Sequence, residues 1–135
     1  MKGARALLAL PFLLPALAQA AEESLRVELN AGETADNRCR LTFLIENKAK
    51  SPVESFKLDL AVFNTDGVVQ HRMVTEMAPV RPVKTVVRTF SLDGECKQIG
   101  SILVNDVTAC APGAPSTCLD GLELSSRLKG VRFYK

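Results

Sequence analysis

The chain has 135 residues, of which 47% are hydrophobic, 17 are basic and 15 are acidic. Its length suits one domain with a single core. The two surplus cations, Lys2 and Arg5, lie in the first 20 residues, and the other 115 residues carry equal numbers of basic and acidic side chains. This balance argues against nucleic acid as a partner, because phosphate binding needs a surplus of Lys and Arg on one face.

Residues 1–20 have the layout of a secretory signal peptide. A short basic start precedes an apolar run over residues 6–17, and Ala18-Gln19-Ala20 is a small-x-small cleavage site. The apolar run is too short, and too interrupted by proline, for a membrane span. We therefore predict a mature domain over residues 21–135, starting at Ala21, without a transmembrane segment and periplasmic or secreted. A retained N-terminal anchor helix is the alternative.

Stretches of alternating apolar and polar residues follow one another along the mature chain, and each predicts a half-buried β-strand. In chain order, strands are expected at 24–30, 38–47, 56–64, 68–77 and 85–92, with one or two more within 96–110. Residues 31–37 are an expected polar loop, and Thr65-Asp66-Gly67 is an expected hairpin turn. The prolines within 78–84 predict a crossing loop. Residues 122–135 are ambiguous between a final strand and a short helix followed by a strand.

About seven short strands separated by regular turns are typical of an all-β protein. We therefore predict a single antiparallel immunoglobulin-like β-sandwich, stabilised by disulfides, in which two sheets bury their inner faces. The alternation around them predicts that four large apolar residues lie in the core, namely Phe43, Leu58, Leu60 and Phe90.

An even number of cysteines in an exported chain predicts disulfides, and the mature chain has four: Cys39, Cys96, Cys110 and Cys118. Cys110 and Cys118 flank a loop with two prolines and a glycine, which favours a local bridge. That leaves Cys39, on the second strand, to pair with Cys96 at the start of the sixth, which would join opposite sheets. A metal or redox site is the alternative, but the chain lacks the close C-x₂-C pair that both usually need.

The stretch from Cys39 to Phe90 resembles small immunoglobulin-like modules of exported bacterial proteins, of the FxLYD type and of the related late-embryogenesis-abundant type 2 domains. The resemblance rests on Ile45-Glu46-Asn47 before a loop, on the turn Asn64-Thr65-Asp66-Gly67, and on the proline connection and strand from Pro82 to Phe90. The chain is also similar to short uncharacterised periplasmic proteins of proteobacteria. These resemblances imply an interaction or structural role and bring no catalytic residue with them.

His71 is the one histidine of the chain, and we expect it to be exposed on a strand. A general base or a ligand is the alternative for this residue, but no G-x-S-x-G nucleophile motif accompanies it. Several carboxylates fall in turns or on polar strand faces: Glu54, Asp59, Glu76 and Asp93. We therefore predict no catalytic residue, no metal site and no cofactor.

The C-terminal segment holds a local cluster of basic and aromatic residues, and we predict it as an interaction surface: Arg127, Lys129, Arg132, Phe133 and Tyr134. A last strand with snorkelling side chains is the alternative. From these observations we expect an exported, non-enzymatic module that binds an unknown envelope protein or surface. A small-ligand or metal carrier of the periplasm is the second hypothesis, and an enzyme or enzyme inhibitor is the third.

Overall fold

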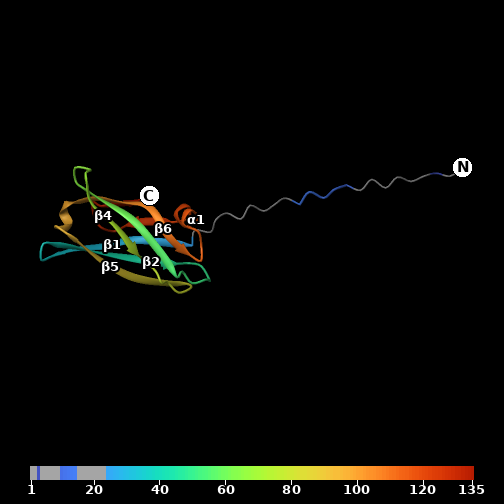
Figure 1. Ribbon diagram of the computed structural model, residues 1–135, viewed down its shortest axis with the longest axis horizontal. Helices are drawn as coiled ribbons and strands as arrows, with labels where there is room; N and C mark the ends of the chain where they lie inside the picture. Colours follow the sequence, from blue (N-terminus) through green and yellow to red (C-terminus); the bar gives the residue numbers. More distant parts are fainter. Residues whose placement is uncertain (1–2, 4–9, 15–23) are drawn as a thin grey trace.

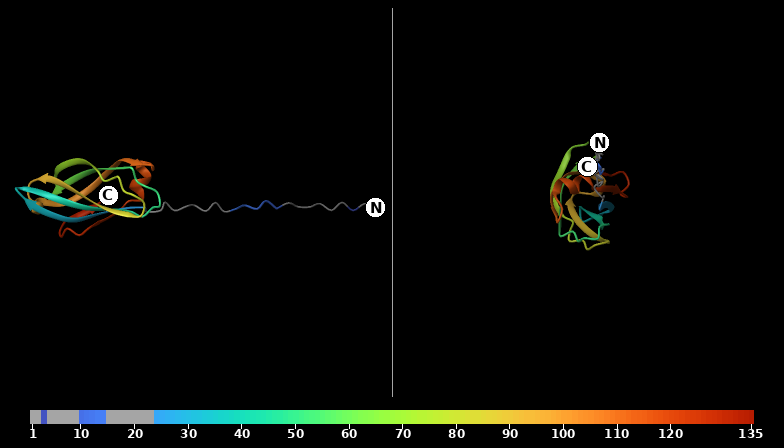
Figure 2. Two further views of the ribbon diagram at one scale, coloured as in Figure 1. Left: turned by 90° about the horizontal axis from the view of Figure 1, so that it is seen from below. Right: turned by 90° about the vertical axis from the view of Figure 1, so that its right-hand side faces the viewer.

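The computed structural model describes Gly3, residues 10–14 and residues 24–135, so the predicted cleavage site and mature N-terminus lie outside the described residues. Residues 24–135 form two four-stranded sheets that pack as two layers (Figures 1 and 2). The prediction of an all-β sandwich stabilised by disulfides is confirmed. The finer expectation, an immunoglobulin-like topology, stays a prediction.

Each sheet has one long central pair of strands and two edge strands. The first sheet has the order β5-β2-β1-β7 and consists of β1 (Leu25–Ala35), β2 (Arg38–Asn47), β5 (Lys84–Asp93) and β7 (Glu123–Ser126). The second has the order β4-β3-β6-β8 and consists of β3 (Ser55–Asn64), β4 (Val69–Glu76), β6 (Ile99–Ala111) and β8 (Arg132–Tyr134). Two short helices complete the described chain, η1 (Cys96–Gln98) and α1 (Pro115–Asp120).

The expected polar loop at 31–37 is instead strand followed by a tight turn. β1 continues to Ala35 after a bulge near Asn30, and β2 begins only three residues later. The connection is made by Asp36 and Asn37, which have φ angles of 51° and 59°. Asp and Asn tolerate this left-handed conformation, which matches the two-residue turns that join twisted antiparallel strands. The polar composition therefore reflected a hairpin that extends beyond the core, not a loose loop.

The inner faces of the two sheets form the core, as the alternation of residues predicted. Phe43, Leu58 and Leu60 are all buried, and Phe43 contacts the rings of Phe90 and Phe133. Phe90 itself is only half-buried and packs at the margin of the core, because its strand is at the edge of a sheet. The four core residues are thus placed correctly between the sheets, with Phe90 less enclosed than expected.

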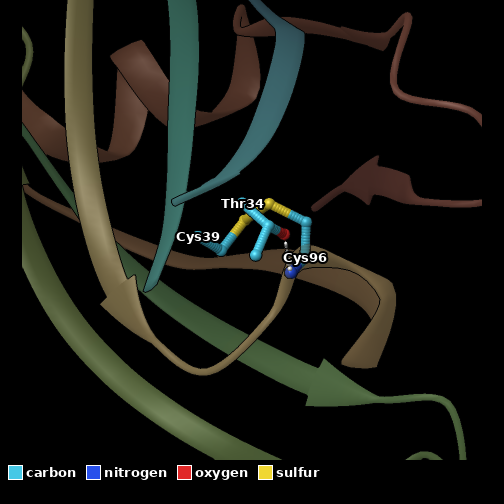
Figure 3. Close-up of a disulfide and its surroundings, with 3 residues drawn as sticks. All are labelled: Thr34, Cys39 and Cys96. Atoms are coloured by element: carbon cyan, nitrogen blue, oxygen red, sulfur yellow. Dashed lines mark hydrogen bonds between the residues drawn. A yellow bond between two sulfur atoms is a disulfide. The ribbon is translucent and has the colours of Figure 1, made fainter. Parts of the chain in front are cut away.

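The bridge between Cys39 and Cys96 fastens one end of the sandwich (Figure 3). Cys39 is buried in phase with Leu41 and Phe43, so it lies on the inner face of β2 as predicted. Cys96, however, lies in η1, within the connection from β5 to β6, and not at the start of a strand. Its amide donates to the hydroxyl of Thr34 at 2.9 Å. The bridge therefore holds the crossing between the sheets against β1 and β2, and does not join two strands of opposite sheets.

The C-terminal part departs most from the prediction. The proline loop contains the helix α1, which carries Cys118 and is tied by its disulfide to Cys110 at the end of β6. The helix reverses the chain, so β7 pairs parallel with β1, and the following turn leads to β8, which pairs parallel with β6. Residues 122–135 thus form two short strands in different sheets, and the sandwich is not purely antiparallel.

The two disulfides are expected to differ in their contribution to stability. They close segments of 57 and 8 residues, and the loop-entropy relation gives about 4 and about 2.5 kcal/mol for those lengths. We predict that Cys39→Ala with Cys96→Ala lowers the free energy of unfolding more than Cys110→Ala with Cys118→Ala. Denaturant melts of the two double variants measure the difference. Equal losses, or a larger loss for the second pair, would show that loop closure does not govern these bridges.

Candidate functional site

The four edge strands of the sandwich differ in length. β7 and β8 have four and three residues, and the chain passes directly from one to the other. β4 and β5 have eight and ten residues, and each leaves one side unpaired along its length. An unpaired edge offers a row of backbone donors and acceptors to another chain, and a long one needs protection against indiscriminate pairing. The side bounded by β4 and β5 is therefore the open side of this sandwich.

The β5 edge carries a protective charge. Arg88 is in phase with Phe90 and Leu92, so its side chain points inward, and it is half-buried. Its Nη2 donates to the carbonyl oxygen of Pro79 at 3.1 Å, in the connection between β4 and β5. An inward-pointing charge on an edge strand opposes the addition of a further strand, because that strand would enclose the charge. β5 is thus guarded.

The β4 edge has no inward-pointing Lys, Arg, Asp or Glu among its described residues. Its inward residues are His71, Met73 and Thr75, which lie opposite the buried Val62, Leu60 and Leu58 of β3. Three valines in and beside the strand are exposed: Val68 at 56%, Val69 at 46% and Val74 at 60%. A long edge with exposed β-branched residues and no inward charge is suited to receive a strand.

The hydrogen-bond pattern shows which residues of β4 face the open side. The amide of Met77 donates to the carbonyl of Phe56 at 2.8 Å, so the odd-numbered residues of β4 direct their backbone groups at β3. Because bonded and non-bonded pairs alternate in an antiparallel ladder, the N–H and C=O groups of Arg72, Val74 and Glu76 point to the free edge. These same residues carry their side chains on the outer face of the sheet.

Two carboxylates fix β4 to its neighbour, and both favour the ionised form. The side-chain amide of Asn105 and then the guanidinium of Arg72 hold the pKa of Asp59 below its usual value. Burial opposes ionisation of Glu76, but hydrogen bonds from the amides of Phe56 and Ala78 and from the hydroxyl of Ser55 outweigh it and lower the pKa. Each carboxylate thus has its own structural partners in β3 or beside it.

A cavity of about 610 Å³ opens at the disulfide-bound end of the sandwich. Its floor is apolar and includes Val62, Leu92 and Ile99, together with the buried Cys39. Its rim is polar and comes from the β3–β4 hairpin and from the connection between β5 and β6: Asn64, Thr65, Gln70, His71, Asp93, Glu95, Lys97 and Gln98. An apolar floor with a few polar groups at the rim is typical of a site for a small ligand.

The charged groups at the rim are already paired. Arg38 binds Asp93, and Lys97 lies 2.8 Å from Glu95, which raises the pKa of that lysine. His71 is half-buried and lines the cavity, so the prediction that it is simply exposed on a strand is wrong. The strand alternation alone could have indicated this, because His71 shares the inward phase of Met73 and Thr75.

The predicted C-terminal surface is smaller than the sequence suggested. Phe133 is 5% exposed and contacts Phe43, so it belongs to the core and not to the surface. Arg132 is exposed and stacks over the ring of Tyr134 at 3.9 Å. Arg127 and Lys129 are exposed on the turn before β8. The segment is thus a short edge strand with one stacked pair and two separate surface cations.

Residues with metal-binding side chains do not gather in threes within the described part of the chain. No described helix is long and apolar enough to span a membrane. Comparisons with protein families, with curated proteins and with solved structures gave no match. The resemblance to FxLYD and late-embryogenesis-abundant type 2 domains therefore stays a prediction.

Protonation of Glu76 is expected to weaken the fold. Because its folded-state pKa is depressed, the ionised carboxylate stabilises the fold above the usual glutamate pKa, and this contribution is lost as the pH falls through the folded value. We predict that Glu76→Gln lowers stability at neutral pH by about 1–2 kcal/mol and that the difference from the native protein shrinks in acid. Denaturant melts across a pH series test this, with the exposed Glu54→Gln as a control for removing one charge. A difference independent of pH would contradict it.

Proposed function

We propose that this protein is an exported, non-enzymatic interaction module that binds an envelope protein by accepting a strand at its β4 edge. The unguarded β4 edge is the observation that carries the proposal. Arg72, Val74 and Glu76 direct their backbone donors and acceptors at the free edge, and the side chain of Val74 is exposed. Strand addition uses main-chain hydrogen bonds for affinity and the side chains of alternate residues for specificity.

Two observations support export. The sequence of residues 1–20 has the layout of a signal peptide, and all four cysteines are paired in disulfides, which persist in oxidising compartments. We infer a periplasmic or secreted location, where a protein of the cell envelope would be the partner.

A photoreactive residue at position 74 tests the proposal in the native envelope. We expect a covalent adduct from position 74, because this side chain lies at the centre of the free edge. Val87, similarly exposed at 56% but on the guarded β5 edge, is the matched control position. The adduct from position 74 should be lost when Arg72 is replaced by proline, which removes an edge amide. Absence of adducts at position 74 beyond those at position 87 would reject strand addition at β4.

Carriage of a small ligand is the second candidate, and the cavity at the disulfide-bound end favours it. Its volume of about 610 Å³ falls in the range of about 300–1,000 Å³ common for ligand sites. The rim supplies neutral donors and acceptors, and its carboxylates are paired with cations. This predicts an uncharged ligand with an apolar part. The native mass of protein released from the periplasm distinguishes the candidates, since a carrier would retain a small bound molecule.

A further inference from the structure

We propose that the strand received at the β4 edge is β4 of a second copy of this chain, so that the two copies form a symmetric dimer with one continuous sheet. The inference rests on the proposed function of this edge and names its partner. It follows from the arrangement of Arg72, Val74 and Glu76, whose backbone groups point to the free edge of β4.

A bulge limits where a second strand can pair. His71 lies opposite Val62, and Val69 lies opposite Phe63, so Gln70 is an extra residue that interrupts the ladder. Bulged residues bend a strand and disrupt pairing locally. The regular free edge therefore runs from His71 to Glu76. A second strand must pair within this segment to form hydrogen bonds with Arg72, Val74 and Glu76.

One antiparallel register satisfies this segment. In this register the two-fold axis lies between Val74 and Val74 of the second copy. Arg72 of each copy then faces Glu76 of the other, on both sides of the axis. Arg72, Val74 and Glu76 then all form backbone-bonded pairs. Each Arg72 lies opposite a Glu76, and opposite charges on facing residues stabilise a sheet. Centring the pair on Arg72 would place two cations directly opposite each other. Centring it on Met73 would place Glu76 opposite the bulged Gln70.

Arg72 can form this pair without losing its present partner, and Glu76 keeps one carboxylate oxygen, Oε2, which accepts only from the hydroxyl of Ser55, whereas Oε1 accepts from the amides of Phe56 and Ala78. Arg72 binds Asp59 through Nη2, at 2.9 and 3.1 Å to the two carboxylate oxygens. A guanidinium has five N–H donors, and those on Nη1 and Nε make no hydrogen bond to the described residues. Arg72 can therefore bridge Asp59 of its own chain and Glu76 of the second copy. The pairing would also cover Val74, which is 60% exposed in the single chain.

The variant Val74→Cys tests the register directly. The four native cysteines are paired, so the new thiol is the free one. Residues in a backbone-bonded antiparallel pair have Cα atoms about 5.5 Å apart, which lies within disulfide range. We expect mild oxidation to give a covalent dimer at least about tenfold faster than for Val87→Cys, because pairing raises the effective thiol concentration.

Light scattering of the native chain supplies the second measurement. We expect a dimer that dissociates on dilution, and a monomer for Val74→Lys, which places two charges on the axis, whereas Val87→Lys should stay dimeric. A monomeric native chain, with Val74→Cys oxidising no faster than Val87→Cys, would overturn the self-pairing. In that case an adduct between position 74 and a different envelope protein would still support strand addition, so the two proposals fail separately.

Discussion

The unpaired backbone groups at a sheet edge can pair with any other extended chain, and the need to prevent such pairing shapes the whole sandwich. β7 and β8 meet it by being short, and the chain crosses directly from one to the other between the sheets. β5 meets it with Arg88, which points inward and donates to Pro79. β4 has none of these protections within its regular segment. β4 is therefore the edge at which an added strand would cover unpaired backbone groups.

The two ends of the sandwich are held by different means, and this difference places the candidate sites. At one end the Cys39–Cys96 disulfide fixes the crossing from β5 to β6 and leaves a cavity beside it. At the other end the fully buried Asn47 donates to the carbonyls of Ser51, Val80 and Arg81, which joins two loops. Since both ends are fixed, β4 and β5 are presented on a rigid frame, which lowers the entropic cost of adding a strand.

Most strands and core residues could be predicted from the sequence, because the alternation of apolar and polar residues along a strand follows their burial. Cys39, Leu41 and Phe43 are buried in one phase of β2, and both disulfides connect the expected cysteines. The parallel strands β7 and β8 were missed because their pairing depends on how α1 reverses the chain, and a six-residue helix in a proline loop has too little periodicity to be recognised. The Asp36-Asn37 turn was missed although its composition signalled it. The candidate site could not be predicted, because which strands end at an edge is a property of the topology and not of local sequence.

Amide hydrogen exchange along β4 tests the central claim most directly. The amides of Met73 and Thr75 bond to β3 and should exchange slowly at any concentration, as expected from the alternating ladder. Those of Arg72, Val74 and Glu76 point to the free edge, so they should exchange fast in dilute protein and slowly once a partner strand is added. Such alternating, concentration-dependent protection is the predicted result. Free-edge amides that stay unprotected both in concentrated protein and in envelope extract would contradict the account.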